Sequence, residues 1–164
     1  MDITLIVAAD DKDGIAQGGR IPWHIPSDLK RFKALTTGVG PEPSAVLMGR
    51  TTWDSLPAKV RPLPGRRNLV LSRTRQVFEG ATCVSSWQEA LGAAAGCGAL
   101  WIIGGAAVYA LALVEPETSA IELTRIDGDF GCDLLWGGVP EGYRLVVVEE
   151  LDGHRFERWV HPTR

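Results

Sequence analysis

The side chains best suited to chemistry stand together in residues 21–33, where a loop holding a tryptophan leads into a short amphipathic segment. Pro22 and Pro26 disfavour helix in the residues that precede them, so Trp23 is expected on an extended loop. Asp28 follows directly after this loop. The pattern therefore predicts an indole and a carboxylate near each other at the start of a helix.

The helix that carries this acid is predicted over residues 27–37, with Ser27 as its N-cap. Leu29, Phe32 and Leu35 recur at helical spacing. A rotation of about 100° per residue places Asp28 over Phe32 and Leu35, on the face expected to point inward. Two interpretations stay open for the carboxylate. It favours the helix dipole from an exposed first turn, or it lies in an apolar cleft, where it binds a planar cation-like group or influences proton transfer.

The composition describes one ordinary globular domain over residues 1–164, with 45% hydrophobic and 23% charged residues. The net charge of −3 argues against a general affinity for nucleic acid or acidic membranes. The N-terminal apolar run is far shorter than the roughly 20 residues that span a bilayer. We expect a cytoplasmic protein, and a monomer because no exposed apolar stripe is evident.

The three cysteines are widely spaced and form no Cys-x-x-Cys pair, which predicts free thiols in a reducing compartment. The three histidines form no helical pair and lie near no cysteine. We therefore predict that the chain holds no structural metal.

Apolar strands alternate with helices along most of the chain, which predicts a parallel sheet with helices on both sides. Strands are predicted at residues 3–9, 45–49, 68–72, 82–85, 99–103 and 121–126, and helices at 27–37, 50–56, 87–95 and 106–113. Residues 143–151 and 156–160 are expected to form a hairpin around Asp152-Gly153. The expected fold class is thus α/β, with three layers and a mostly parallel, twisted sheet that ends in an antiparallel C-terminal hairpin. The glycine-containing loop at residues 10–20 is long enough to act as a lid.

Polar and glycine residues follow several of these strands, where ligands of open α/β sheets bind. Arg50, with the two threonines after it, offers a cation, hydroxyls and free N–H groups at a helix start, which suits a phosphate. Gly104-Gly105 lets the backbone approach a pyrophosphate. Each feature alone is more typical of a tight turn or an exposed arginine than of a ligand site. Together, Arg50 and Arg73 at neighbouring strand ends favour a 2′-phosphate, and hence NADP(H) over NAD(H).

Three further arginines, Arg61, Arg66 and Arg67, lie in a loop stiffened by prolines. They are either a solvated basic loop or a fork for a substrate carboxylate, which arginine binds in bidentate fashion.

The motifs together resemble the dihydrofolate reductase family, in the family's order and over about the first 126 residues. They are Ile21-Pro22-Trp23, Pro26-x-Asp28-Leu29, Phe32-Lys33, Met48-Gly49-Arg50-x-Thr52-Trp53-x-Ser55-Leu56, Arg61-Pro62-Leu63-Pro64-Gly65-Arg66-x-Asn68, Ile103-Gly104-Gly105-x-x-Val108-Tyr109 and Leu123-Thr124. Residues 56–68 look especially like the mycobacterial-type enzymes.

The resemblance implies a dihydrofolate-reductase-like fold and the NADPH-dependent reduction of 7,8-dihydrofolate to tetrahydrofolate, with hydride reaching pterin C6 and a proton reaching N5. It implies dihydrofolate and diaminopyrimidine or pteridine antifolates as ligands. Asp28 would bond the pterin and help bring the proton, with Thr124 supporting it, and residues 14–23 would form the lid. The implied catalytic residues are Trp23, Asp28 and Thr124. The implied substrate contacts are Ile6, Val7, Asp28, Phe32, Leu63, Arg66 for the glutamate carboxylate, Ile103, Tyr109 and Thr124.

The cofactor contacts that the resemblance implies fall into four groups along the chain. They are Ala8, Ile15, Gly19 and Arg20; Gly49, Arg50, Thr51 and Thr52; Leu71, Ser72 and Arg73; and Ile103, Gly104, Gly105, Ala106, Ala107, Val108 and Tyr109. Ala106 stands where many members have a third glycine. An insertion at residues 38–44 and a poor match after Asp127 leave the distal cleft and the edge strands open. The alternatives are a reductase of a riboflavin precursor with the same fold and a protein that binds NADPH or folate without turnover.

Overall fold

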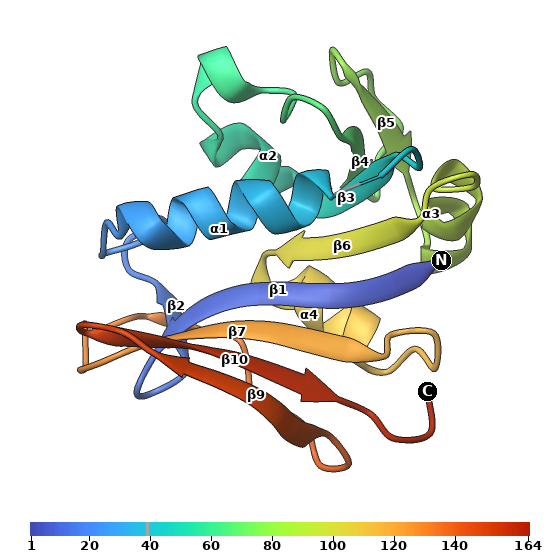
Figure 1. Ribbon diagram of the computed structural model, residues 1–164. Helices are drawn as coiled ribbons and strands as arrows, with labels where there is room; N and C mark the ends of the chain where they lie inside the picture. The colour runs from blue at the N-terminus through green and yellow to red at the C-terminus, as the bar shows by residue number, and fades with distance from the viewer. Residues whose placement is uncertain (39) are drawn as a thin grey trace.

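The computed structural model describes residues 1–38 and 40–164, and within them eight strands form one sheet that draws on both ends of the chain (Figure 1). Val39, inside the predicted 38–44 insertion, lies outside the described residues. The sheet order is β5-β4-β3-β6-β1-β7-β10-β9. Its strands are β1 (Asp2–Asp10), β3 (Ser44–Gly49), β4 (Arg67–Leu71), β5 (Ala81–Val84), β6 (Ala99–Gly104), β7 (Ala120–Ile126), β9 (Arg144–Glu150) and β10 (His154–Val160).

The pairing directions agree with the predicted α/β class. The pairs from β5 across to β7 are parallel, whereas β10 runs antiparallel to both β7 and β9. A smaller pair joins β2 (Gly14–Ala16) to β8 (Leu134–Leu135) in antiparallel fashion. The prediction of a mostly parallel sheet with an antiparallel C-terminal edge is confirmed.

Helices cover both faces of the sheet, as expected for strands that are apolar on both sides (Figure 1). They are α1 (Pro26–Thr37), α2 (Arg50–Ser55), α3 (Trp87–Ala93) and α4 (Ala106–Leu113), with a 3₁₀ turn η1 (Ala58–Val60). One core cluster joins alternate strand residues, such as Leu5 and Leu47, to α3 and α4. The other joins the intervening residues, such as Ile6 and Met48, to Phe32 of α1 and to α2. The sheet therefore separates two cores, and the site must form where its strands end.

Helix α1 begins differently from the prediction. Its first residue is Pro26 and its N-cap position is Ile25, which offers no side-chain hydrogen bond. Ser27 lies one residue inside the helix, so it cannot accept from the N–H groups that a cap serves, and its prediction as the N-cap is wrong. Its hydroxyl instead lies 3.1 Å from Nε2 of His154 on β10.

Strand β9 departs from the expectation that no apolar stripe is exposed. It is the edge of the sheet, and the exposed fractions of Leu145, Val146, Val147 and Val148 lie between 44% and 55%. Its pairing with β10 is interrupted by a register shift near Arg158. Irregular, charged edges resist pairing with a second chain.

The structure also bears on the expectations about the cysteines, a metal site and the membrane. The structure has free thiols at Cys83, Cys97 and Cys132. No cluster of His, Cys, Asp or Glu in residues 1–38 and 40–164 is arranged to hold a metal ion. Over the same residues, no helix combines the length and apolarity needed to cross a membrane.

Candidate active site

A cleft of about 1080 Å³ opens where β1, β3, β4 and β6 end, and it is the right size for a dinucleotide. Each residue assigned to the cofactor from the sequence lines this cleft. These are Ala8, Ile15, Gly19, Arg20, Gly49, Arg50, Thr51, Thr52, Leu71, Ser72, Arg73, Ile103, Gly104, Gly105, Ala106, Ala107, Val108 and Tyr109. The four segments that the sequence placed at strand ends are thus brought to one cavity.

Close packing at the floor of the cleft explains two of its glycines. A Cβ on Gly49 would lie 3.2 Å from Cγ2 of Val108, so this glycine lets the start of α4 approach β3. Gly104 has φ of 120°, and a Cβ there would lie 3.2 Å from the hydroxyl of Tyr109. Gly105 is the N-cap of α4 and has no side chain that could bond the first N–H groups of the helix. The first N–H groups of α4 can therefore serve a phosphate.

Cations border the cleft where an anionic cofactor would need them. Arg50 is exposed, and its only ion pair within the described residues is a 3.6 Å contact with Asp54 between two largely solvent-exposed side chains. Such a pair contributes at most about 1 kcal/mol, so the guanidinium can turn towards a ligand. Arg20 and Arg73 are also exposed at the cleft rim.

The first part of the predicted lid, residues 14–20, is held by hydrogen bonds. Within it, β2 pairs with β8, and the Gly18 N–H donates to Oδ2 of Asp133 at 3.0 Å. Gln17 and Arg20 close the tip through paired backbone hydrogen bonds. Ile15 and Gly19 line the cleft from this loop. The segment that the sequence predicted as a polar loop therefore includes a short strand, because a partner strand far along the chain completes it.

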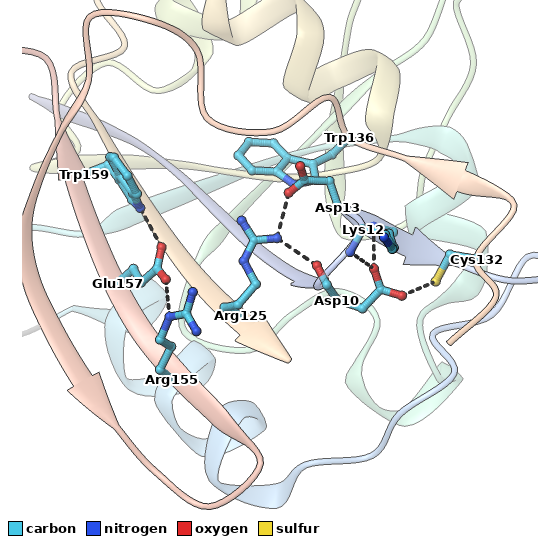
Figure 2. A network of polar contacts seen from close by, with 10 residues as sticks. Asp10, Lys12, Asp13, Arg125, Cys132, Trp136, Arg155, Glu157 and Trp159 are labelled. Atoms are coloured by element: carbon cyan, nitrogen blue, oxygen red, sulfur yellow. Dashed lines mark hydrogen bonds and ion pairs between the residues drawn. The ribbon is translucent and has the colours of Figure 1, made fainter. Parts of the chain in front are cut away.

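Asp10, the last residue of β1, holds the start of this lid through hydrogen bonds (Figure 2). Its carboxylate is fully buried and accepts from the N–H groups of Lys12 and Gly14 at 2.9 Å, and from that of Phe130 at 3.0 Å. Burial alone would raise the pKa of Asp10, but these hydrogen bonds, with one from the Cys132 thiol, bring that pKa below its ordinary value. The acid therefore stays ionised and joins the start of the lid to residues 130–132.

Arg125 extends the same network to Asp13, the residue before β2 (Figure 2). Its Nη1 donates to the Asp10 carbonyl and to Oδ1 of Asp13, both at 2.7 Å. Trp136 Nε1 donates to the same Asp13 oxygen at 3.2 Å. Asp13 has φ of 60°, an unusual backbone for a residue other than glycine. These contacts hold the tight turn from which the lid departs.

Asp28 is partly buried and faces Thr124 of β7. Thr124 Oγ1 donates to Asp28 Oδ1 at 2.6 Å, across 96 residues of sequence. Thr124 is opposite Ala8 in the β1–β7 register, and Ala8 lines the cleft, so the carboxylate lies beside the cleft. Burial raises the pKa of Asp28, while the hydrogen bond from Thr124 and the charges of Arg31 and His154 act against the rise. Of the two interpretations, the structure supports the inward carboxylate.

An apolar wall adjoins this acid. Ile6 and Leu63 are buried in one cluster, and Phe32 and Ile103 pack against it. Val7, which was placed in the same wall, instead belongs to the opposite core cluster and lines the dinucleotide-sized cleft. Successive strand residues point to opposite faces, so Ile6 and Val7 cannot share one wall through their side chains.

Tyr109 connects the wall to the cleft. Its hydroxyl lies 2.8 Å from the Ile6 carbonyl oxygen and 3.0 Å from that of Ile103. Burial raises the pKa of Tyr109, and the charge of Asp28 raises it further. The phenol therefore stays neutral, and it fixes the spacing of the two central strands.

The three arginines predicted as a possible fork do not gather. Arg66 lies beside α1, where its Nη1 donates to Thr36 Oγ1 and its Nε to the Pro64 carbonyl, both at 2.9 Å. Arg67 turns away and donates to carbonyls at the end of α3, and Arg61 lies 5.7 Å from the Trp53 ring centroid. Only Arg66 keeps a position near Phe32, and burial lowers its pKa without removing its charge.

Asn68 supports Arg66 by fixing its loop. This buried side chain accepts from the Leu63 N–H and donates to the Leu63 and Arg66 carbonyls, each at 2.9 Å. The remaining N–H groups of the Arg66 guanidinium can therefore be presented from a fixed loop to a carboxylate.

Part of the cleft lining was not assigned to the cofactor from the sequence, although Val7 was assigned to the substrate and Ala16 and Ile21 lie in the predicted lid. The cleft's further lining residues are Val7, Ala16, Ile21, Ser55, Ser85, Ser86, Trp87, Gln88, Leu111, Glu115 and Leu134. Ser86 is the N-cap of α3, with its side chain accepting from the Glu89 N–H, and this capping signal was readable in the sequence. Glu115 and Leu134 carried no local signal, because only the fold brings them to the rim.

A dinucleotide-sized cleft at the ends of parallel strands, beside a partly buried carboxylate on an apolar wall, is typical of an α/β protein that binds a dinucleotide next to a second ligand. The sequence profile of the family described as dihydrofolate reductase matches residues 2–154. The chain belongs to the dihydrofolate reductase family.

Individual relatives agree with this assignment. The chain is 47% identical to the dihydrofolate reductase of Mycobacterium tuberculosis over 126 residues, which cover 76% of this chain and 71% of that protein. It is 44% identical to the Mycobacterium leprae enzyme over 126 residues, or 76% and 72% of the two chains. It is 42% identical to that of Neisseria meningitidis over 128 residues, or 77% and 74%. The mycobacterial resemblance noted in residues 56–68 extends to most of the chain.

Proposed function

We propose that this protein reduces 7,8-dihydrofolate to 5,6,7,8-tetrahydrofolate with NADPH. The observation that carries the proposal is the 2.6 Å hydrogen bond between Thr124 and Asp28, placed between the apolar wall and the dinucleotide-sized cleft. A partly buried carboxylate that is held by a hydrogen bond suits the N3–H and 2-amino group of a pterin.

The residues present fit the proposed cofactor. The N–H groups at the start of α4 and the close approach at Gly49 suit its pyrophosphate. Arg50 and Arg73 suit a 2′-phosphate, and Ile15 and Gly19 would cover the nicotinamide from the lid. NADPH, when bound, supplies the hydride.

The chain's own residues supply position and proton control. Ile6, Phe32, Leu63 and Ile103 would hold the pterin ring against the sheet and exclude water from it. Asp28 would orient the ring and help a water bring the proton to N5, since Thr124 holds the carboxylate in place. Trp23, half-buried at the base of the lid and 5.3 Å from the Phe130 ring, would close over this region.

Arg66 would take the glutamate α-carboxylate of the substrate. Diaminopyrimidine and pteridine antifolates would compete at the same wall, because their protonated rings pair with a carboxylate such as Asp28. We further propose a monomer, because β9 is irregular and its ends carry Arg144, Glu149 and Glu150. A reducing compartment such as the cytoplasm suits the three free thiols.

The test is the loss of NADPH absorbance when dihydrofolate is added, with and without a 2,4-diaminopyrimidine antifolate. Rapid, inhibitor-sensitive oxidation supports the proposal. Reduction of a riboflavin precursor in place of dihydrofolate would support the alternative reductase. NADPH binding without any oxidation would support the protein that binds without turnover. The family membership and the retained Asp28–Thr124 pair favour neither alternative.

A further inference from the structure

His154 is a buried histidine that the reaction described above does not use. It begins β10 and is 7% exposed. Its Nε2 lies 3.1 Å from Ser27 Oγ, and its Nδ1 lies 2.9 Å from the Asp152 carbonyl oxygen. The ring thus joins the first turn of α1 to the C-terminal hairpin.

The partners of the two ring nitrogens define what the imidazole can do. A carbonyl only accepts, so Nδ1 carries the hydrogen that points to Asp152, and in the neutral ring Nε2 accepts from the Ser27 hydroxyl. When the ring is protonated, Nε2 donates and the hydroxyl rotates to accept. The link to Ser27 persists in both states. Protonation therefore changes the charge at this position and leaves the contact in place.

That charge is close to the carboxylate of the site. Ser27 directly precedes Asp28, and Phe156 is opposite Thr124 in the β7–β10 register. His154 lies two residues before Phe156 on the same face of β10, and their ring centroids are 5.4 Å apart. The positive form of His154 favours the ionised form of Asp28. The Ser27 link therefore holds a titratable ring beside Asp28.

Other charged groups at this junction pair with one another. Arg31 of α1 donates to Glu122 of β7 at 2.8 Å and lies 4.2 Å from the Phe156 ring centroid. Arg158 of β10 pairs with the other oxygen of Glu122 at 2.5 Å.

Two further groups complete the surroundings. Tyr109 of α4 stays neutral because burial raises its pKa. The Asp152 residue is exposed at the hairpin turn. His154 is thus the imidazole that Ser27 holds at the start of α1.

We propose that His154, which Ser27 holds beside the first turn of α1, is a positioning residue whose positive charge favours the carboxylate form of Asp28. This proposal rests on the proposed function for its kinetic consequence only, because the effect on Asp28 exists in the protein without substrate.

The test compares three variants of the full-length chain. His154→Gln keeps a side chain that can accept from Ser27 and donate to Asp152, but it cannot become charged. His154→Phe loses both the contact and the charge. His161→Gln is the matched control, because His161 packs against Tyr143 at the other end of β10.

The primary measurement is the titration of the Asp28 carboxyl carbon by NMR in protein labelled at aspartate, assigned with Asp28→Asn. Loss of the positive charge should raise the Asp28 midpoint in His154→Gln by about 0.3 pH unit or more, a twofold change in the protonation constant. His161→Gln should leave the midpoint unchanged. A midpoint in His154→Gln equal to that of the wild type would overturn the proposal, as would an equal shift in His161→Gln. If His154→Phe fails to fold, the Gln variant still decides.

The kinetic measurement is the pH profile of kcat and KM for dihydrofolate. The profile of His154→Gln should be displaced in the same direction as the Asp28 titration, with kcat at its optimum within about twofold of the wild type. An undisplaced profile beside a displaced titration would overturn the kinetic part. A wild type that does not turn over dihydrofolate would reject the proposed function, and the titration would still judge the His154–Asp28 coupling.

Discussion

Replacing Thr124 with valine would isolate the hydrogen bond on which the site depends. Valine has nearly the same shape, and Thr124 is 3% exposed, so the change removes a donor without opening a cavity. Its Oγ1 is 2.6 Å from Asp28 Oδ1. A hydrogen bond to a charged group contributes about 1.5–3 kcal/mol. We use the lower end of this energy range for the Thr124–Asp28 bond, because Asp28 is only partly buried and solvent screens its charge.

The expected effect on Asp28 follows from this magnitude. One pKa unit corresponds to about 1.4 kcal/mol, so Thr124→Val should raise the pKa of Asp28 by about one further unit. Burial already raises this pKa above the unfolded value, so the native state binds more protons than the unfolded state between the two pKa values. Stability therefore falls as pH rises through that window, and it falls further in the variant. The loss should be near zero below about pH 4 and about 1.4 kcal/mol at neutral pH.

Urea unfolding across this pH range measures the effect directly. Thr82→Val, on the exposed edge strand β5, is the matched control and should cost the same small amount at every pH. A loss in Thr124→Val that does not grow with pH, or one that the control reproduces, would refute the reasoning.

Three further predictions concern the cleft, the acid and the lid. Asp28→Asn should bind NADPH normally, as measured by fluorescence. Its turnover should fall most severely at neutral and higher pH and recover partly in acid, where the substrate is already protonated. An unchanged pH profile would remove Asp28 from the proton step. Arg50→Ala with Arg73→Ala should weaken NADPH at least about tenfold more than NADH, and equal losses in a titration would reject the 2′-phosphate assignment. Asp10→Asn should cost about 1–3 kcal/mol at neutral pH, because an amide cannot accept from every donor that the carboxylate serves. The pKa of Asp10 is lowered in the fold, so this loss should shrink as pH falls below about 4, and a pH-independent loss in thermal unfolding would contradict it.

Much of the architecture was accessible from local sequence signals. Strands buried on both faces read as continuous apolar runs, and Asp152-Gly153 marked the C-terminal hairpin, where the Leu151 N–H does bond the His154 carbonyl. Glycines and cations follow several strands, and this pattern predicted where the cleft lies. The carboxyl ends of parallel strands meet at one edge of the sheet. These are consequences of periodicity and topology.

Other features depended on contacts between distant segments. β2 exists only because β8 pairs with it. The hydroxyl of Ser27, which lies inside α1 and not at its cap, contacts His154, 127 residues away. The solvent-exposed stripe of β9 was not recognised, since an edge strand and a central strand can share the same apolar sequence. The role of Asp28 was likewise open until the structure brought Thr124 to it.

The central claim is that this site brings a hydride donor and a pterin together beside Asp28. The most direct test uses NADPH that carries deuterium at the transferable C4 position, with dihydrofolate as acceptor. Mass and NMR analysis of the product should find one deuterium at C6 of tetrahydrofolate, with formation blocked by a diaminopyrimidine antifolate. Oxidation of NADPH that leaves the pterin unlabelled at C6 would contradict the account.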